Sequence, residues 1–303
     1  MILTVTLNAA LDVTYTVERV VTGESHRVRG VTQRAGGKGI NVARVLRTLG
    51  SPVLATGLAG GDTGRSLLDE LTSSGIPHEF VPIDGESRRT VAVVSANDGE
   101  ATLFNEPGPE VSAAEWTAFV ERFRSLASRA SVVVLSGSMP PGVPEDGYAH
   151  LVSLVDGKTI VDASGPALRH AVAMRPNVIK PNARELAETT GHSELAPGIS
   201  SLLRDGAQAV VASLGPEGLL AATEGASWRL APPARLAGNP TGAGDACVAG
   251  LAAGLLAGAD WPALLREAVA LSAAAVVHPV AGGVDADTYA QLRATLPGAR
   301  KAL

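Results

Sequence analysis

The chain has 303 residues, of which 46% are hydrophobic and 18% charged, and it carries a formal net charge of -5 and a single cysteine, Cys247. This length is enough for a large buried core, the negative charge argues against general binding to nucleic acid or an anionic membrane, and one cysteine cannot form an internal disulfide. No apolar run of about 18 residues predicts a membrane span and no leader pattern opens the chain, so we expect a cytoplasmic location.

Short apolar or β-branched runs recur along the chain and predict strands. They lie at residues 2–7, 53–56, 91–95, 132–135, 159–161, 178–180 and 210–213. Between many of them are segments with helical periodicity, at residues 40–49, 64–74, 113–126, 182–190 and 245–256. This alternation predicts an α/β fold with a mainly parallel sheet covered on both faces and ligands at the carboxyl ends of its strands.

Two segments interrupt this alternation, residues 11–34 and residues 87–105, the second with a turn at Asn97-Asp98-Gly99. Their polar-faced patterns predict strands and hairpins. Such hairpins either form a small sheet that acts as a lid and excludes water from a reaction, or are ordinary strands at a sheet edge.

The most informative segment is residues 239–250, in which Gly242, Ala243 and Gly244 precede a helix expected to begin near Asp245. Helix N-termini leave backbone N–H groups unpaired and carry a partial positive charge, so a phosphate can bind there without lysine. At the cap, Asp245 is placed to take a proton from a hydroxyl that attacks phosphorus. The alternative interpretation is that Asp245 only caps the helix.

A second glycine-rich segment, residues 35–43, also opens a helix and places Lys38 and Asn41 beside a backbone with little side-chain bulk. Its spacing is not that of a Walker A loop, which needs four residues between its first glycine and Gly-Lys-Ser/Thr. An amide and an ammonium beside accessible backbone suit a polyhydroxylated, phosphorylated ligand. A tight turn with a solvated lysine is the alternative.

Two further segments follow predicted strands, at residues 179–185 and 211–218. Asn182 and Glu185 are one helical turn apart and are predicted to orient magnesium through water, because magnesium dehydrates reluctantly. A capping box at a helix start is the alternative for this pair. In the second segment, Ser213, Gly215 and Gly218 are predicted to line the path of a nucleotide. A Gly-Pro turn is the alternative explanation for these residues.

Five motifs follow one another along the chain: Gly-Gly-Lys-Gly-Ile-Asn-Val-Ala (36–43), Ser-Gly-Ser-Met-Pro-Pro-Gly (136–142), Lys-Pro-Asn (180–182), Ser-Leu-Gly (213–215) and Gly-Ala-Gly-Asp (242–245). In this order they resemble the PfkB family of ribokinase-like carbohydrate kinases, and the match covers nearly the whole chain. Within this family, the chain is most similar to the branch that contains tagatose-6-phosphate kinase and 1-phosphofructokinase. Asn239-Pro240 fits that branch, whereas the widespread family form has Asp-Thr there.

The resemblance implies one domain over residues 1–303, a three-layer α/β/α sandwich with a small β-sheet lid formed by about 11–34 and 87–105. It implies Asp245 as the catalytic base and Gly242, Ala243 and Gly244 as the anion hole. Substrate-binding positions would be Asp12, Gly36, Gly37, Lys38, Asn41, Arg88 and Ser138, with Arg88 on the phosphate already present. The ATP and magnesium side would comprise Lys180, Asn182, Glu185, Ser213, Gly215 and Gly218.

The resulting hypothesis is an ATP- and Mg2+-dependent kinase that adds a second phosphate to fructose 1-phosphate, fructose 6-phosphate or tagatose 6-phosphate, with neither nucleic acid nor membrane as a partner. The resemblance also implies a homodimer joined through the lid. One alternative is a kinase for an unphosphorylated sugar or nucleoside, against which Arg88 and Lys38 argue. Another is a non-catalytic sugar-phosphate sensor, which would need no base. A dinucleotide-dependent dehydrogenase is disfavoured because residues 7–12 lack the Gly-x-Gly-x-x-Gly turn.

Overall fold

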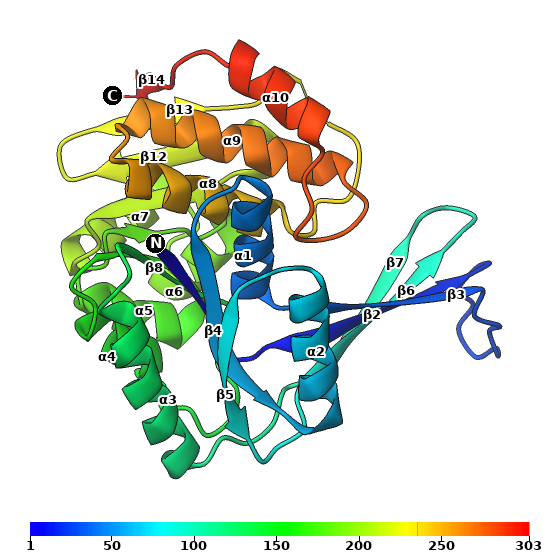
Figure 1. The fold of residues 1–303 in the computed structure, drawn as a ribbon. Helices are drawn as coiled ribbons and strands as arrows, with labels where there is room; N and C mark the ends of the chain where they lie inside the picture. The colour runs from blue at the N-terminus through cyan, green and yellow to red at the C-terminus, as the bar shows by residue number, and fades with distance from the viewer. Residues whose placement is uncertain (235, 303) are drawn as a thin grey trace.

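The main feature of the computed structural model, which describes residues 1–234 and 236–302, is a ten-stranded sheet (Figure 1). Residues 235 and 303, which the single-domain prediction includes, lie outside the described residues. The strands of this sheet are β1 (Ile2–Thr6), β4 (Val53–Gly60), β5 (His78–Ile83), β8 (Val132–Ser136), β9 (Lys158–Asp162), β10 (Val178–Ile179), β11 (Ala209–Ser213), β12 (Leu219–Thr223), β13 (Ser227–Leu230) and β14 (Arg300–Ala302). Their order is β14-β13-β12-β11-β10-β9-β8-β1-β4-β5.

Two helical layers cover this sheet. One contains α1 (Lys38–Thr48), α2 (Gly61–Ser73), α8 (Ala243–Ala257), α9 (Trp261–Val277) and α10 (Ala286–Thr295), and the other α3 (Ala113–Ala127), α4 (Gly147–Ser153), α5 (Gly165–Ala173), α6 (Ala183–Thr190) and α7 (Leu195–Asp205). Each face of the sheet has its own hydrophobic core beneath one helical layer. Successive side chains of a strand point to opposite faces, so Val132 and Val134 of β8 pack in the core of the first layer, while Val133 and Leu135 pack in the core of the second. The predicted three-layer α/β/α fold is confirmed.

Strands β11, β10, β9, β8, β1, β4 and β5 are parallel, so their carboxyl ends meet at one edge of the sheet. The antiparallel strands β12 to β14 extend the sheet beyond β11. Ser136 ends β8, Asp162 ends β9 and Ser213 ends β11, which places these polar residues along the edge where a parallel sheet presents ligands.

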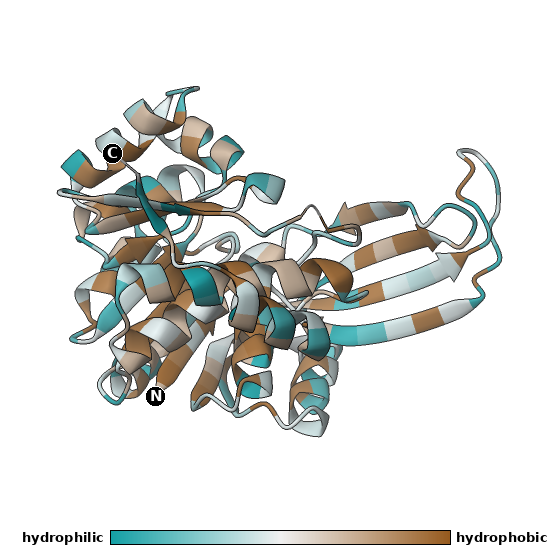
Figure 2. Cartoon of the chain, turned by 90° about the horizontal axis from the view of Figure 1, so that it is seen from above, coloured by the Kyte–Doolittle hydropathy of each residue, from teal (hydrophilic) through white to brown (hydrophobic). Residues whose placement is uncertain are grey.

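A second, four-stranded sheet has the order β3-β2-β6-β7, with β2 (Ala10–Val17), β3 (Gly30–Gly36), β6 (Arg88–Ser95) and β7 (Ala101–Asn105). Residues 91–95, expected among the strands, therefore belong to this sheet and not to the central one. Figures 1 and 2 show it extending away from the helical layers. Its strands carry apolar side chains that are more than half exposed, including Val31, Leu103 and Phe104.

The first turns of α1 and α8 lie side by side over the central strands (Figure 1), and these two helices contact each other directly. Each is preceded by a glycine with positive φ, Gly37 at 107° and Gly242 at 87°. Such values favour glycine and let the chain turn sharply into a helix. In the described part of the chain, no helix is long and apolar enough to cross a bilayer.

Candidate active site

The N-terminus of α8 is open to an anion. Gly242 is the N-cap, and the helix begins at Ala243, two residues before Asp245, near which it was expected to begin. The Ala243 N–H donates to the Pro240 carbonyl at 3.1 Å, whereas within the described chain no carbonyl accepts from the N–H of Gly244 or Asp245. Two backbone donors at a helix start thus remain free, which suits a phosphate oxygen.

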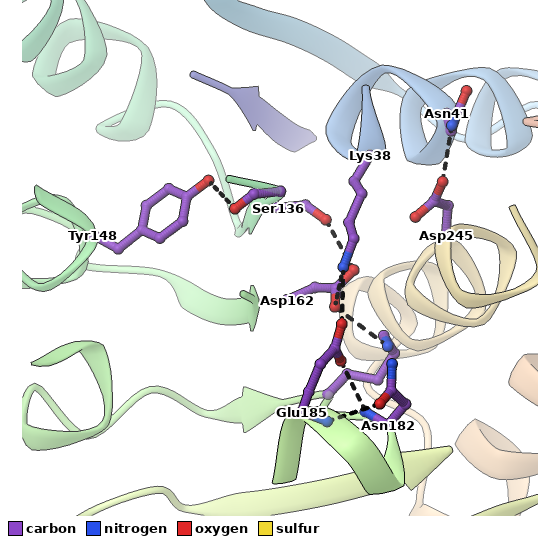
Figure 3. Close-up of polar contacts among 10 residues, drawn as sticks. Lys38, Asn41, Ser136, Tyr148, Asp162, Asn182, Glu185 and Asp245 are labelled. Carbon is purple, nitrogen blue, oxygen red and sulfur yellow. Dashed lines mark hydrogen bonds and ion pairs between the residues drawn. The ribbon is translucent and has the colours of Figure 1, made fainter. Parts of the chain in front are cut away.

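Asp245 does not cap the helix, because its side chain turns to α1 instead. Its Oδ2 accepts a hydrogen bond of 2.8 Å from Asn41 Nδ2, and both side chains are buried (Figure 3). Burial first, and then the negative charge of Asp162, raise the pKa of Asp245 to about 7, against the lowering effects of Asn41, Lys38 and Lys180. A carboxyl group with a pKa near neutrality can accept a proton from a hydroxyl group and release it again.

A buried charge cluster lies beside Asp245, at the ends of β9 and β10. Asp162 Oδ1 is 3.3 Å from Lys38 Nζ and 3.2 Å from Lys180 Nζ, and its Oδ2 accepts from the Ser136 hydroxyl at 3.1 Å (Figure 3). Burial alone would raise the pKa of Asp162, but the two lysines hold it below the ordinary value. A carboxylate with this many donors stays ionised and holds both ammonium groups in place.

Sequence reasoning missed Asp162, although its position directly after a predicted parallel strand was an available signal. Lys38 was expected on the sugar side, yet its Nζ also lies 3.6 Å from Glu185 Oε1 and so reaches across the site toward the predicted ATP side. Lys180 is almost fully buried beneath α8, and a Cβ at Gly244 would lie 3.7 Å from its Nζ. The cluster thus places two positive charges close to the open N-terminus of α8.

Asn182 and Glu185 form a complete capping box at the start of α6. Asn182 Oδ1 accepts from the Glu185 N–H and Glu185 Oε2 accepts from the Asn182 N–H, each at 2.9 Å. The capping box, which was the alternative interpretation for this pair, is therefore present in the structure. It leaves Glu185 Oε1 available toward Lys38 and the rest of the site.

Several of the predicted sugar-binding residues lie at the base of the second sheet. Asp12 of β2 and Gly36 of β3 approach so closely that a Cβ at Gly36 would come within 2.0 Å of Asp12 Oδ2. Burial raises the pKa of Asp12 to about 6, although a hydrogen bond from Thr90 and the charge of Arg88 act to lower it. Gly36 is therefore needed where the backbone meets this carboxylate.

Arg88 lies on β6, close to Asp12. Its Nε donates to the Asn8 carbonyl at 3.1 Å and one terminal nitrogen donates to the Glu106 carbonyl at 3.3 Å. The guanidinium has five N–H donors, so these two bonds fix its plane and leave donors for a ligand. The next residue, Arg89, is exposed and pairs with Glu106.

Asn8 and Arg34 are further polar residues here that sequence reasoning missed. Asn8 Nδ2 donates to the Pro107 carbonyl at 3.0 Å and to the hydroxyl of Ser138, a predicted substrate contact, at 3.2 Å. Arg34, opposite Asp12 in the β2–β3 ladder, donates to the Ala281 carbonyl at 2.9 Å. Ala281 packs on Gly242, where a Cβ would lie 3.0 Å from Ala281 Cα, so Arg34 links the second sheet to the start of α8.

The remaining glycines have different surroundings. Gly37 and Gly39 lie against Thr6 of β1, where a Cβ would come within 2.6 Å and 2.5 Å of its side chain. Gly218 is buried, and a Cβ there would lie 2.1 Å from the Leu230 carbonyl in the β12–β13 hairpin. Close packing therefore accounts for these three residues. By contrast, Gly215 is exposed with open space beside it, and Ser213 is bridged to Asn182.

The chain matches one family model and several solved structures. The family model described as pfkB family carbohydrate kinase matches residues 5–286. Phosphofructokinase-2 from Escherichia coli, in complex with potassium, superposes with a TM-score of 0.92 at 29% identity, covering 97% of this chain and 98% of that one. The same enzyme with fructose-6-phosphate has a TM-score of 0.89 at 30% identity, with 97% and 98% coverage.

Two Thermotoga maritima structures are also similar. A possible 1-phosphofructokinase has a TM-score of 0.89 at 28% identity, and the match covers all of both chains. Ribokinase has a TM-score of 0.79 at 17% identity with 96% and 98% coverage, which supports the ribokinase-like fold alone. Together with the match over most of the chain, these likenesses show that this protein belongs to the pfkB family of carbohydrate kinases.

Proposed function

We propose that this kinase transfers the γ-phosphoryl group of ATP to a hydroxyl of a ketohexose phosphate, with Asp245 as the base. The observation that carries the proposal is the buried Asp245 carboxyl beside the open N-terminus of α8, flanked by two lysines. A single base, free backbone donors and fixed positive charge are the parts that phosphoryl transfer needs.

In the proposed reaction the acceptor hydroxyl oxygen forms a bond to the γ-phosphorus, the bond from that phosphorus to ADP breaks, and the hydroxyl proton moves to Asp245. The free N–H groups of Gly244 and Asp245 hold the transferring phosphate, and Gly242, with φ of 87°, lets the chain turn sharply into the helix. Lys38 and Lys180 offset the negative charge that gathers around the phosphorus. Ala243 supports the turn through its bond to Pro240.

The side chains fit magnesium as an ion held mainly through water. The described residues gather no group of three or more His, Cys, Asp or Glu side chains at one point. In the capping box, Glu185 keeps one oxygen free and Asn182 keeps part of its acceptor capacity, so both can contact metal-bound water. When bound, the ion would neutralise charge on the ATP phosphates. We place the nucleotide along Ser213 and the open backbone of Gly215, with Gly218 supporting this edge from inside the hairpin.

The acceptor is placed at the base of the second sheet, against Asp12, the backbone of Gly36 and Gly37, and Ser138. Arg88 is proposed to bind the phosphate that the substrate already carries, because its plane is fixed and it has unused donors. The second sheet would then act as the lid. E. coli phosphofructokinase-2, crystallised with fructose-6-phosphate, offers a precedent for such an acceptor.

The exposed apolar side chains of the second sheet also form the proposed surface for a homodimer. Val31 of β3 and Leu103 and Phe104 of β7 are 55%, 51% and 58% exposed, which is unusual for side chains of this size. Pairing two such sheets would remove these side chains from water. A tetrameric form of E. coli phosphofructokinase-2 supports self-association in a relative.

The substrate is tested by steady-state kinetics of the purified protein with MgATP and fructose 1-phosphate, fructose 6-phosphate, tagatose 6-phosphate or fructose. We expect at least one ketohexose phosphate to give its bisphosphate and ADP in equal amounts, with kcat/KM for fructose lower by about 100-fold or more, since one lost charge-assisted contact costs about that much. Equal use of fructose, or no phosphorylation of the three phosphates, would overturn the proposed acceptor.

A further inference from the structure

We propose that Asn8 is a positioning residue that holds Arg88 and Ser138 toward the phosphate of the substrate, an inference that rests on the proposed acceptor. Asn8 lies two residues beyond the end of β1 and is only 7% exposed. It is hydrogen-bonded to three separate segments, which are the start of β6, the connection after β7 and the loop after β8. One buried residue therefore joins the second sheet to a loop of the central sheet.

Asn8 holds the Arg88 guanidinium by two routes. The first route is direct, because the backbone carbonyl of Asn8 accepts from Arg88 Nε at 3.1 Å. In the second route, Asn8 Nδ2 donates to the Pro107 carbonyl at 3.0 Å. The adjacent carbonyl, that of Glu106, accepts from a terminal nitrogen of Arg88 at 3.3 Å. Loss of the Asn8 side chain would release this connection and weaken one of the two bonds that fix the guanidinium plane.

The same amide determines what Ser138 offers to a ligand. The orientation of the amide is fixed, because only its nitrogen can donate to the Pro107 carbonyl. That nitrogen also donates to Ser138 Oγ at 3.2 Å, and this is the one hydrogen bond of the Ser138 hydroxyl within the described residues. The hydroxyl proton of Ser138 is therefore free to be donated. Because Ser138 is exposed, a phosphate oxygen can reach it.

The other face of the amide is closed by Gly108, in the connection after β7. Gly108 has φ of 98°, and a Cβ there would lie 2.2 Å from Asn8 Oδ1 and 3.1 Å from Asn8 Nδ2. The amide oxygen is buried, and no donor among the described residues bonds to it. A buried acceptor without a partner lowers stability, and an apolar side chain of similar size would avoid this loss. The two bonds made by the donor therefore explain why an amide lies here.

These contacts predict an effect on substrate recognition and not on the chemical step. Arg88 and Ser138 both bond to Asn8 at 3.1–3.2 Å, so their remaining donors start from neighbouring points. A guanidinium and a hydroxyl donor side by side suit the oxygens of one phosphate group. In the described chain, none of the hydrogen bonds of Asn8 reaches Asp245 or the two lysines beside it. A change at Asn8 should therefore raise KM and leave kcat nearly unchanged.

The test is steady-state kinetics of the full chain with MgATP and the ketohexose phosphate that the wild-type protein accepts, beside the unphosphorylated hexose. For Asn8→Ala we expect KM for the ketohexose phosphate to rise by about tenfold, the effect of weakening one or two hydrogen bonds to a charged ligand. The kcat, the KM for MgATP and the kcat/KM for the unphosphorylated hexose should each change by less than about twofold. A change in kcat alone, or equal losses on both acceptors, would overturn the inference.

A second variant, Gly108→Ala, displaces the amide without removing it and tests the same contact if Asn8→Ala does not fold. Its Cβ would collide with Asn8 Oδ1, so the same selective rise in KM is expected. Gly99, in the turn between β6 and β7, is the matched control, with φ of 75° and open space beside it. Gly99→Ala should leave KM unchanged. An equal rise from Gly99→Ala would assign the effect to backbone strain and overturn the inference.

Arg88→Ala separates this inference from the proposed function. If Arg88→Ala leaves KM for the ketohexose phosphate unchanged, the proposed phosphate contact fails, and the inference fails with it. If Arg88→Ala raises KM and Asn8→Ala does not, only the positioning role of Asn8 is wrong. In a chain with both Arg88→Ala and Ser138→Ala, Asn8→Ala should raise KM by less than about twofold, because neither donor remains to be held. A further rise of about tenfold there would show that Asn8 acts by another route, and would overturn the inference.

Discussion

The two proposed ends of the site, one for phosphoryl transfer and one for binding the acceptor, are built differently. At the transfer end, Asp162 and Lys180 are buried, and each charge has a partner within 3.3 Å before any ligand arrives. At the acceptor end, Asp12 and Arg88 are only partly buried, on strands of a sheet that extends away from the core. The groups proposed to handle the transferring phosphate are therefore preorganised, whereas the groups proposed to recognise the acceptor lie on a second sheet that contacts α1 and α2 through β2 and β3 and otherwise extends away from the helical layers.

This difference has a physical basis. Transition-state charge is stabilised best by groups that need no rearrangement when the charge develops, and burial among packed helices provides this rigidity. A substrate, however, must enter and leave, so the surface that encloses it has to open. The contrast predicts severe, pH-sensitive effects at the transfer end and selective, milder effects at the acceptor end.

The largest effect is expected for Asp245→Asn. It removes the proton acceptor and preserves the shape, so kcat should fall by about three orders of magnitude or more while sugar-phosphate binding changes little. Turnover from rapid quench and binding from calorimetry measure the two quantities. Near-normal turnover would contradict the role of Asp245 as the base and, with it, the contrast between the transfer end and the acceptor end.

Arg88→Ala should have the next largest effect, on recognition alone. We expect KM for the ketohexose phosphate to rise by about 100-fold, with little change for the unphosphorylated hexose, which never makes the contact. Arg89→Ala is the matched control, since Arg89 is exposed and pairs with Glu106. Equal losses of activity on both substrates, or the same selective effect from Arg89→Ala, would contradict the proposal that Arg88 binds the substrate's phosphate.

Asp245→Asn should also stabilise the fold, because burial of the charged Asp245 carboxylate lowers the free energy of unfolding. The folded-state pKa of Asp245 is raised from 3.8 to about 7, so the cost is fully present above pH 7 and shrinks as pH falls toward 4. At pH 8 we expect the free energy of unfolding to rise by roughly 2 kcal/mol, or Tm by about 5 °C. This is less than the full pKa shift corresponds to, because the amide of the variant does not satisfy all the hydrogen bonds of its surroundings. Thermal unfolding at pH 8 and pH 5 checks this, and a gain that is equal at both would contradict it.

The smallest effect on activity is expected from the exposed apolar residues of the second sheet. Phe104→Ser should weaken self-association by about tenfold and lower Tm of the separated chain by less than about 2 °C, because Phe104 packs on little within one chain. Sedimentation at several concentrations measures the association. Val277→Ser is the control, with a 41% exposed side chain on α9. A wild-type protein that is monomeric at every concentration would contradict the dimer.

Some features of the site follow from local sequence. Gly242, Ala243 and Gly244 before an apolar helical segment predict an open helix start, because only residues without bulk let the backbone face an anion. The regular alternation of apolar strands and amphipathic helices predicts a parallel sheet covered on both faces, since period and burial are local properties. Asp162 and Asn8 each directly follow a predicted strand, at residues 159–161 and 2–7, but this position does not reveal the distant side chains that they contact.

The sequence by itself thus determined the layered fold and the glycine-rich turns before α1 and α8, whose causes lie within a few residues of each other. Only the tertiary structure decided which side chains meet. Asn41 and Asp245 are separated by 204 positions, and Lys38 is 124 positions from Asp162, so no local spacing relates them. The tertiary structure also showed that Gly218 is required by hairpin packing and that Lys38 reaches Glu185 on the predicted ATP side. Pairing over such distances depends on how helices pack on a common sheet, which is a property of the whole fold.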